Sequence, residues 1–199
     1  MKVFPQKSAL ALSAVLAAGL LSTVIDGAWA QTVITVGSGR AHDCFLRAKS
    51  GMAPRESVEL CSTALQIEPL SRKDRAGTYD NRGVILDVLG RSDEAAKDFH
   101  DAIALNPELG DAYVNLGSML IKRGEHQAAL EQINTGINLG MSFPHIGYYD
   151  RAVAEQMLGR YKEAYYDYKK VLELEPNFIM ASERLKDFVV TRVPANAPS

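Results

Sequence analysis

The sequence has few of the residues on which most enzyme and metal chemistry depends. It contains two cysteines, one tryptophan and four histidines in 199 residues. None of the histidines has a second histidine at the short spacing of a zinc site; they are His42, His100, His126 and His145. The motifs Gly-x-Ser-x-Gly and His-Glu-x-x-His are also absent. We therefore predict a protein that is not an enzyme and that has no metal site and no cofactor.

An excess of charge of one sign is lacking too. The chain has 22 basic and 24 acidic residues, a formal net charge of -2, and no long basic run. Proteins that bind nucleic acids carry a basic patch or stripe, so we predict no nucleic-acid partner. With 47% hydrophobic and 23% charged residues, the composition is that of a folded globular domain rather than of a disordered or membrane chain.

Long hydrophobic runs are absent except near the N-terminus. Lys2 and Lys7 give a positive start, residues 9–24 are mostly apolar, and Ala28-Trp29-Ala30 has the small-x-small pattern of a cleavage site. The apolar run is shorter than the roughly 20 residues that a spanning helix needs, which favours a signal peptide over an uncleaved anchor.

We predict that the signal peptide comprises residues 1–30 and that cleavage separates Ala30 from Gln31. The mature protein would then be periplasmic or secreted, with no membrane span. Residues 31–41 follow, and their β-branched stretch from Thr32 to Val36 predicts an N-terminal arm. This arm is expected to be either a short strand or an extended segment laid on the first helices, because five residues cannot form a stable sheet alone.

Most of the remaining chain repeats one pattern. Gly90, Gly124 and Gly159 recur at intervals of 34 and 35 residues. Other positions keep the same interval, as expected if each copy is one structural unit. They hold a tyrosine (Tyr79, Tyr113, Tyr148), an alanine (Ala95, Ala129, Ala164) and a large residue (Phe99, Ile133, Tyr168).

These positions resemble the tetratricopeptide repeat (TPR), a helix-turn-helix unit of about 34 residues. The resemblance implies an all-α fold, a right-handed solenoid of antiparallel helix pairs, with units at 76–109, 110–143 and 145–177. The second unit departs from the family pattern, since Met141 replaces its closing proline and Gly136 its second small residue. We expect an altered turn between this unit and the third.

Apolar residues at three- and four-residue spacing indicate the helices of these units. The expected spans are 74–89, 92–105, 108–123, 126–139, 145–158 and 161–174. The family's leucine before the first-helix glycine is kept only as Leu116, and arginine replaces it at Arg82 and Arg151. This replacement predicts weaker packing at two of the three positions.

A degenerate unit, residues 42–69, precedes the three repeats and contains both cysteines. By the resemblance, Cys44 and Cys61 lie on facing helices, and in an exported chain they are expected to form a disulfide. Two buried free thiols are the alternative. At the other end, residues 178–191 are expected to form a helix that caps the last repeat, and residues 192–199 a disordered tail.

The resemblance also implies a concave groove lined by the first helix of each unit. The groove residues carried over from the family are Asp80, Asn81, Val84, Asp87, Asp111, Asn115, Ser118, Lys122, Tyr149, Asp150 and Gln156. Asn81, Asn115 and Asp150 occupy equivalent positions, and the two asparagines can both donate and accept hydrogen bonds to the backbone of an extended peptide. Ordinary solvated polar residues are the alternative interpretation.

Some members of the family bind an acidic C-terminal peptide through a cluster of lysines and arginines in this groove. Here the groove contains four aspartates and Lys122 as its main basic residue, so such a clamp is not expected. A neutral or basic protein or peptide partner fits this charge better. We therefore predict a non-catalytic interaction module or scaffold of the cell envelope that binds its partner in the groove. The alternative is an accessory subunit that docks through its convex face or its N-terminal arm, and an enzyme with an unrecognised site is the remaining class.

Overall fold

The computed structural model describes residues 2–5, 34, 39–51 and 55–191. The expected cleavage between Ala30 and Gln31 and the expected tail at 192–199 lie outside these residues, as do most of the signal peptide and most of the arm. Among the described residues, no helix has both the length and the apolar character needed to cross a membrane.

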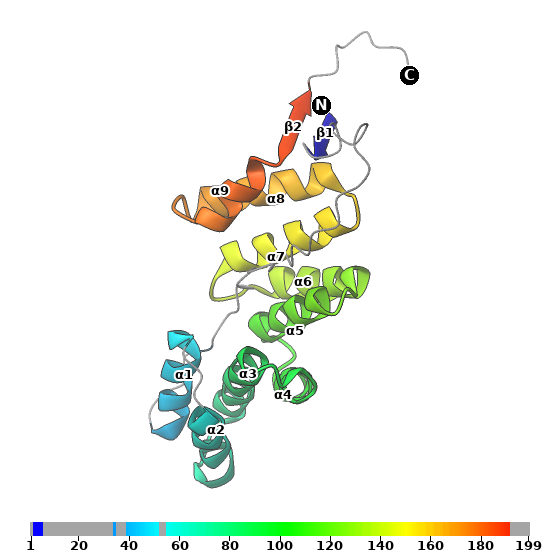
Figure 1. Cartoon of the computed structure of the whole chain (residues 1–199). Helices are drawn as coiled ribbons and strands as arrows, with labels where there is room; N and C mark the ends of the chain where they lie inside the picture. The colour runs from blue at the N-terminus through cyan, green and yellow to red at the C-terminus, as the bar shows by residue number, and fades with distance from the viewer. Residues whose placement is uncertain (1, 6–33, 35–38, 52–54, 192–199) are drawn as a thin grey trace, which may run out of the picture.

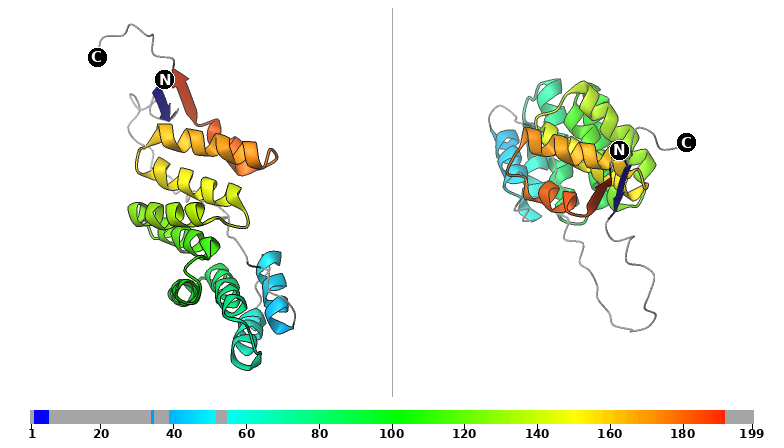
Figure 2. Two further views of the ribbon diagram at one scale, coloured as in Figure 1. Left: turned by 180° about the vertical axis from the view of Figure 1, so that it is seen from behind. Right: turned by 90° about the horizontal axis from the view of Figure 1, so that it is seen from above.

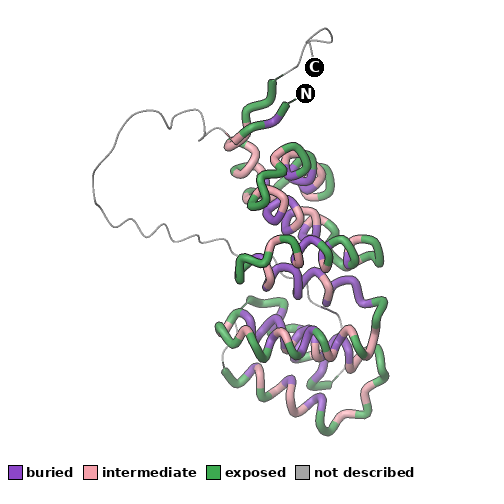
Figure 3. Tube along the Cα trace, turned by 90° about the vertical axis from the view of Figure 1, so that its right-hand side faces the viewer, coloured by how far each residue is buried: buried purple, intermediate pink, exposed green. Residues whose placement is uncertain are grey.

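The described chain is a column of antiparallel helix pairs (Figure 1). The elements are β1 (Lys2–Pro5), α1 (Arg40–Ser50), α2 (Arg55–Ile67), α3 (Arg72–Val88), α4 (Ser92–Leu105), α5 (Gly110–Lys122), α6 (His126–Leu139), α7 (Pro144–Met157), α8 (Tyr161–Leu174), α9 (Ile179–Leu185) and β2 (Phe188–Thr191). Figure 2 shows the stack from behind and from above, with α1 and α2 at one end and the two strands at the other. Buried residues lie where neighbouring helices meet (Figure 3). The expected all-α solenoid of helix pairs is confirmed.

The glycines that revealed the period end the first helix of each pair. Gly90, Gly124 and Gly159 have φ values of 74°, 79° and 75°, a left-handed conformation that L side chains rarely adopt. In each turn the N–H of the following residue reaches back to a carbonyl five residues earlier, as in the bond from Arg91 to Leu86. This is the Schellman helix end, and its recurrence explains why glycine is repeated at this point.

The second unit differs from the others because two glycines bring α5 and α6 unusually close. A Cβ atom on Gly110 would lie 2.1 Å from the carbonyl oxygen of Gly140 and 2.6 Å from that of Gly136. Conversely, a Cβ atom on Gly136 would lie 2.5 Å from the oxygen of Gly110. Glycine at position 136 therefore allows the backbones of α5 and α6 to touch. The turn that follows leads into α7, which begins at Pro144.

The arginines that replace leucine do not weaken the packing as expected, because each joins three helices. Arg82 on α3 donates two hydrogen bonds of 2.7 Å to Asp98 on α4 and one of 2.8 Å to Ser62 on α2. Arg151 on α7 repeats this arrangement with Asp167 on α8 and Asn134 on α6. Each guanidinium also lies over a tyrosine ring of its own helix, at 5.3 Å and 5.1 Å from the centroid. At both positions an arginine–aspartate ion pair therefore provides the contact between helices that leucine provides in the family pattern.

Replacing Arg82 by leucine is expected to lower the free energy of unfolding by about 2 kcal/mol, because the buried Asp98 carboxylate loses its cation. The middle repeat supplies the matched control, since it holds Leu116 and Gln132 at the equivalent positions. The double variant Arg82→Leu/Asp98→Gln is expected to recover most of the loss in urea denaturation. Equal losses in the single and double variants would contradict this account of the pair.

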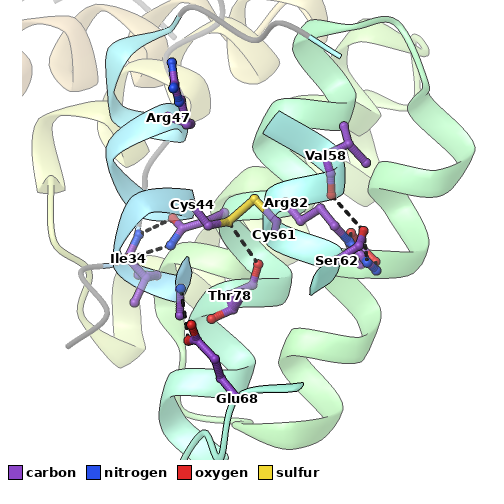
Figure 4. Close-up of a disulfide and its surroundings, with 12 residues drawn as sticks. Ile34, Cys44, Arg47, Val58, Cys61, Ser62, Glu68, Thr78 and Arg82 are labelled. Carbon is purple, nitrogen blue, oxygen red and sulfur yellow. Dashed lines mark hydrogen bonds and ion pairs between the residues drawn. A yellow bond between two sulfur atoms is a disulfide. The ribbon is translucent and has the colours of Figure 1, made fainter. Parts of the chain in front are cut away.

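The degenerate first unit is a helix pair, α1 and α2, joined by a disulfide. Cys44 and Cys61 are bonded with their Cα atoms 5.0 Å apart, and both side chains are fully buried. Figure 4 shows the bond between the two helices, next to Thr78 of α3. Glu68 holds the start of α1, accepting hydrogen bonds of 2.6 Å and 3.2 Å from the backbone N–H groups of Arg40 and Ala41.

The C-terminal helix is shorter than expected. The sequence analysis predicted one helix over 178–191, but α9 ends at Leu185 and Phe188–Thr191 forms β2, which pairs antiparallel with β1. Phenylalanine, valine and threonine favour strands, and β1 supplies the neighbour that a strand needs. The segment still covers the last repeat, because Phe178, Ala181, Leu185 and Phe188 pack in one cluster with residues of α7 and α8. Cleavage after Ala30 would remove β1 from the mature chain.

Candidate functional site: the groove formed by α3, α5 and α7

Three equivalent side chains form the middle of the candidate groove. Asn81 on α3, Asn115 on α5 and Asp150 on α7 stand 34 and 35 residues apart, so the repeat places them at the same turn of successive first helices. All three are fully buried. A buried polar side chain needs a hydrogen-bond partner, and the three find theirs in different ways.

Asn81 holds the backbone of a segment far away in the sequence. Its side-chain oxygen accepts a hydrogen bond of 2.8 Å from the N–H of Ile34, and its side-chain nitrogen donates one of 2.6 Å to the Ile34 carbonyl. Figure 4 marks both bonds at Ile34 with dashed lines. An amide that pairs with the N–H and the C=O of one residue recognises backbone, whatever side chain that residue carries.

The side chain of Ile34 packs in an apolar cluster formed by α3, α4 and α5. The cluster contains the buried residues Ala76, Ala102, Leu109 and Ala112, with Tyr79, Ile103 and Leu105 at its edge. Beside Ile34, a cleft of about 740 Å³ opens between the start of α3 and the turns before α5 and α7. Arg72, Lys73, Asp111 and Ser142 line it. The site thus combines a backbone clamp, an apolar cup and a polar cleft.

The other two equivalent side chains link neighbouring helices. Asn115 donates a hydrogen bond of 3.0 Å to one oxygen of Asp80, and Asp150 accepts a short hydrogen bond from the hydroxyl of Ser118. The second oxygens of Asp80 and Asp150 are buried and have no hydrogen-bond partner in the part of the chain that the structure describes. Each carboxyl group therefore has one buried oxygen that receives no hydrogen bond from the described residues.

Burial changes the charge of these carboxyls. It raises the pKa of Asp80 well above its ordinary value, with smaller contributions from the charges of Asp111 and Asp98. It raises the pKa of Asp150 to about 8, although the hydrogen bond from Ser118 and the charge of Lys122 act in the opposite direction. Asp150 is therefore mostly protonated at neutral pH, and burial disfavours the charged form of Asp80 as well.

Comparisons with known proteins agree with this architecture. A family model of the tetratricopeptide repeat matches residues 145–178. The structure of a thermophilic TPR protein from Thermus thermophilus superposes with a TM-score of 0.60 at 21% sequence identity, covering 74% of this chain and 78% of that one. The fold is therefore TPR-like, and residues 145–178 match the repeat itself. The MamA crystal structure has the same fold, with a TM-score of 0.58 at 19% identity over 75% of this chain and 82% of that one.

Two relatives carry information beyond the fold. A lipoprotein NlpI homolog of Haemophilus influenzae is 31% identical over 109 residues, which are 54% of this chain and 34% of that protein. The match thus spans about a third of the relative's length. The first TPR domain of Spaghetti (RPAP3), whose structure contains a bound HSP90 peptide, is 27% identical, with a TM-score of 0.54 over 60% of this chain and 93% of that one.

The remaining TPR groove residues named from the sequence divide into two groups. Lys122 and Asp87 form an ion pair between α5 and α3, and Asp111 accepts hydrogen bonds from Ser142 before α7. These contacts join successive repeats. Val84, Tyr149 and Gln156 instead take part in packing: the first two lie in the core clusters, and Gln156 accepts a hydrogen bond of 2.8 Å from the hydroxyl of Tyr168.

Two features of the repeat array were missed in the sequence. The occupation of the Asn81 site by Ile34 has no local signal, because the two residues are 47 positions apart. The three-helix ion pairs did have a signal in the sequence. Arg82 and Arg151 are each followed 16 residues later by an aspartate, whereas Leu116, at the equivalent position of the middle repeat, is followed by Gln132. The covariation of the two positions within the chain would have indicated the pair.

Replacing Asp150 by asparagine is expected to change how stability depends on pH. Because the pKa is about 8 in the folded protein and near 3.9 in an unfolded chain, the folded state binds the extra proton between these values. Stability is therefore lost as pH rises from about 4 to 8, at up to about 1.4 kcal/mol per pH unit. Asp150→Asn keeps an acceptor for Ser118 and removes this contribution. Lys122 and Tyr168 are the other titratable groups coupled to this carboxyl.

Urea denaturation at several pH values between 5 and 9 measures this effect. The stability of Asp150→Asn relative to the unsubstituted protein is expected to increase with pH up to about 8 and then to level off. Asp80 leaves a remaining slope in both proteins because its pKa is also raised. If the two proteins show the same pH dependence, the carboxyl is not protonated in the folded state.

Proposed function

We propose that the protein is a non-catalytic interaction module of the cell envelope that binds an extended segment of a protein partner in the groove formed by α3, α5 and α7. The observation that carries this proposal is the pair of hydrogen bonds between Asn81 and the backbone of Ile34. They give this face a geometry suited to holding an extended chain through its main-chain groups.

The electrostatics of the groove narrow the class of partner. Burial raises the pKa of Asp80 and raises that of Asp150 to about 8, which disfavours negative charge at both groups, and the charge of Asp87 is balanced by Lys122. A neutral extended segment suits this surface better than a strongly charged one. The peptide bound by the Spaghetti TPR domain supports the binding mode, since its structure is similar to this one.

The envelope location rests on the predicted signal peptide, the disulfide between Cys44 and Cys61 and the match to a lipoprotein. Disulfides persist in oxidising compartments such as the bacterial periplasm. Fractionation of cells followed by intact-mass analysis tests it. We expect the protein in the envelope or periplasmic fraction, beginning at Gln31, and a protein that retains residues 1–30 in the cytoplasm would contradict the proposal.

A photo-crosslinking amino acid placed in the groove tests the binding face. We choose position 122, because the side chain of Lys122 is partly exposed next to the groove residues of α5. Lys97 is the matched control, because it is exposed on α4, a helix that contributes nothing to the groove. Crosslinks to a partner in the envelope are expected from position 122 and not from position 97. The triple variant Asn81→Ala/Asn115→Ala/Asp150→Ala is expected to lose them.

The same experiment addresses the alternative function. An accessory subunit that docks through its convex face would crosslink from position 97, and the triple variant would leave those crosslinks unchanged. Circular dichroism of each variant is needed to establish that the helices are retained. Crosslinks from position 97 alone would contradict the proposed groove.

A further inference from the structure

The backbone clamp at Asn81 is occupied in this structure by the chain itself. Both hydrogen-bonding groups of the Asn81 amide are used by Ile34, and the amide is fully buried. In an extended backbone, the N–H and C=O of one residue point to the same side, which is the arrangement that a single amide can pair with. Another extended segment can use this clamp only after Ile34 has left it.

The contact of Ile34 is selective for its side chain as well as for its backbone. Ile34 is 9% exposed, and the cup beneath it is formed by three fully buried alanines, Ala76, Ala102 and Ala112, with Leu109 beside them. Small side chains leave room for a branched aliphatic group, and the cup offers no polar atom of these side chains to a charged one. A charged side chain inside this cup would find no partner among the residues that form it, which is strongly unfavourable, whereas Arg72 and Lys73 lie outside it in the adjoining cleft.

We propose, building on the proposed function, that the partner presents a branched aliphatic residue in an extended segment to the Asn81 site, and that Ile34 occupies this site as an intramolecular ligand that the partner must displace. Ile34 is the template for that segment: one residue with its N–H and C=O clamped and its side chain in the apolar cup.

The start of α1 is held at a fixed point, six residues after Ile34. The backbone N–H groups of Arg40 and Ala41 are held by Glu68, and α1 packs on α3, so the chain enters α1 six residues after Ile34 from a fixed point. A short tether gives a ligand an effective concentration in the millimolar range. Free peptides of moderate affinity therefore compete poorly, and release of the arm is expected to raise the apparent affinity of the groove at least about tenfold.

A fluorescent synthetic peptide tests this inference. The peptide carries the sequence of residues 31–39 and is titrated into the exported protein and into its Ile34→Asp variant, in which the charged side chain is expelled from the cup. We expect Ile34→Asp to bind the peptide at least about tenfold more tightly than the unsubstituted protein, and Ile34→Val to resemble the latter. Circular dichroism shows whether the helices are intact, and Ile34→Gly serves as a second released variant.

Two matched controls isolate the clamp and the cup. A peptide N-methylated at its isoleucine lacks the N–H that donates to Asn81, and a peptide with aspartate in place of isoleucine lacks the aliphatic group. Both are expected to lose at least about tenfold in affinity for Ile34→Asp. Adding Asn81→Ala to that variant is expected to have the same effect with the original peptide.

Several outcomes would overturn the inference. Equal peptide affinity for the unsubstituted protein and both released variants would show that Ile34 does not compete for the site. Dimers of the unsubstituted protein that dissociate on Ile34→Asp substitution, seen by sedimentation, would show that the arm occupies a second copy. Neither result decides whether a partner binds in the groove, because crosslinking from position 122 tests that independently. Failure of this inference can therefore be distinguished from failure of the proposed function.

Discussion

Alanine in place of Gly110 is expected to lower the free energy of unfolding by about 3 kcal/mol, the upper part of the range for overpacked sites. The added Cβ atom would lie 2.1 Å and 2.6 Å from the carbonyl oxygens of Gly140 and Gly136. These are backbone atoms, so α5 and α6 must move apart to relieve the contact. Urea denaturation followed by circular dichroism measures the loss.

Gly124→Ala is the matched control for this substitution. Gly124 has a positive φ of 79°, but no atom of the described residues lies within 4 Å of its added Cβ, so the substitution is expected to cost only about 1 kcal/mol of backbone strain. A Gly110→Ala protein as stable as the Gly124→Ala protein would mean that the helices do not approach as closely as the structure shows.

Removal of the disulfide is expected to lower the free energy of unfolding by about 3 kcal/mol, the value of the chain-entropy model for a loop of this length. The bond closes a loop between residues separated by 17 positions. The effect is expected to be local, because terminal units of a repeat array have one neighbour instead of two. In the variant Cys44→Ala/Cys61→Ala, amide exchange should therefore increase first in α1 and α2.

Reductant provides the control. It is expected to destabilise the unsubstituted protein and to leave the double alanine variant unchanged, and the mass of the denatured protein should rise by two hydrogens on reduction. A mass that does not change would show two free thiols in place of the bond. Release of α1 should also loosen the arm, since α1 begins six residues after Ile34.

The sequence was sufficient to predict the repeating part of the fold for a local reason. Each unit needs a left-handed helix end, and Gly90, Gly124 and Gly159 supply it at a fixed interval. The helices between these turns follow from apolar spacing that is visible within a single segment. Their boundaries differ from the expected ones by a few residues, as at α5, which begins at Gly110.

The features that were not predicted depend on contacts between distant segments. β2 required a partner at the opposite end of the chain. The residues of Phe188–Thr191 favour a strand, but a strand also needs a neighbour, and that neighbour cannot be read from the stretch itself. The groove residues were named as a row, but their burial, and with it the raised pKa values of Asp80 and Asp150, is set by neighbouring repeats. The two ion pairs also lie between helices.

Amide exchange at Ile34, measured by NMR on the exported protein, tests the central claim most directly. The claim is that Asn81 holds the backbone of the residue bound to it, and the hydrogen bond from the Ile34 N–H to Asn81 predicts slow exchange at that amide. Asn81→Leu is expected to speed this exchange at least about tenfold, while Asn138→Leu, a substitution at an exposed asparagine on α6, is expected to leave it unchanged. An Ile34 amide that exchanges at the rate of an unstructured peptide in the unsubstituted protein would contradict the claim.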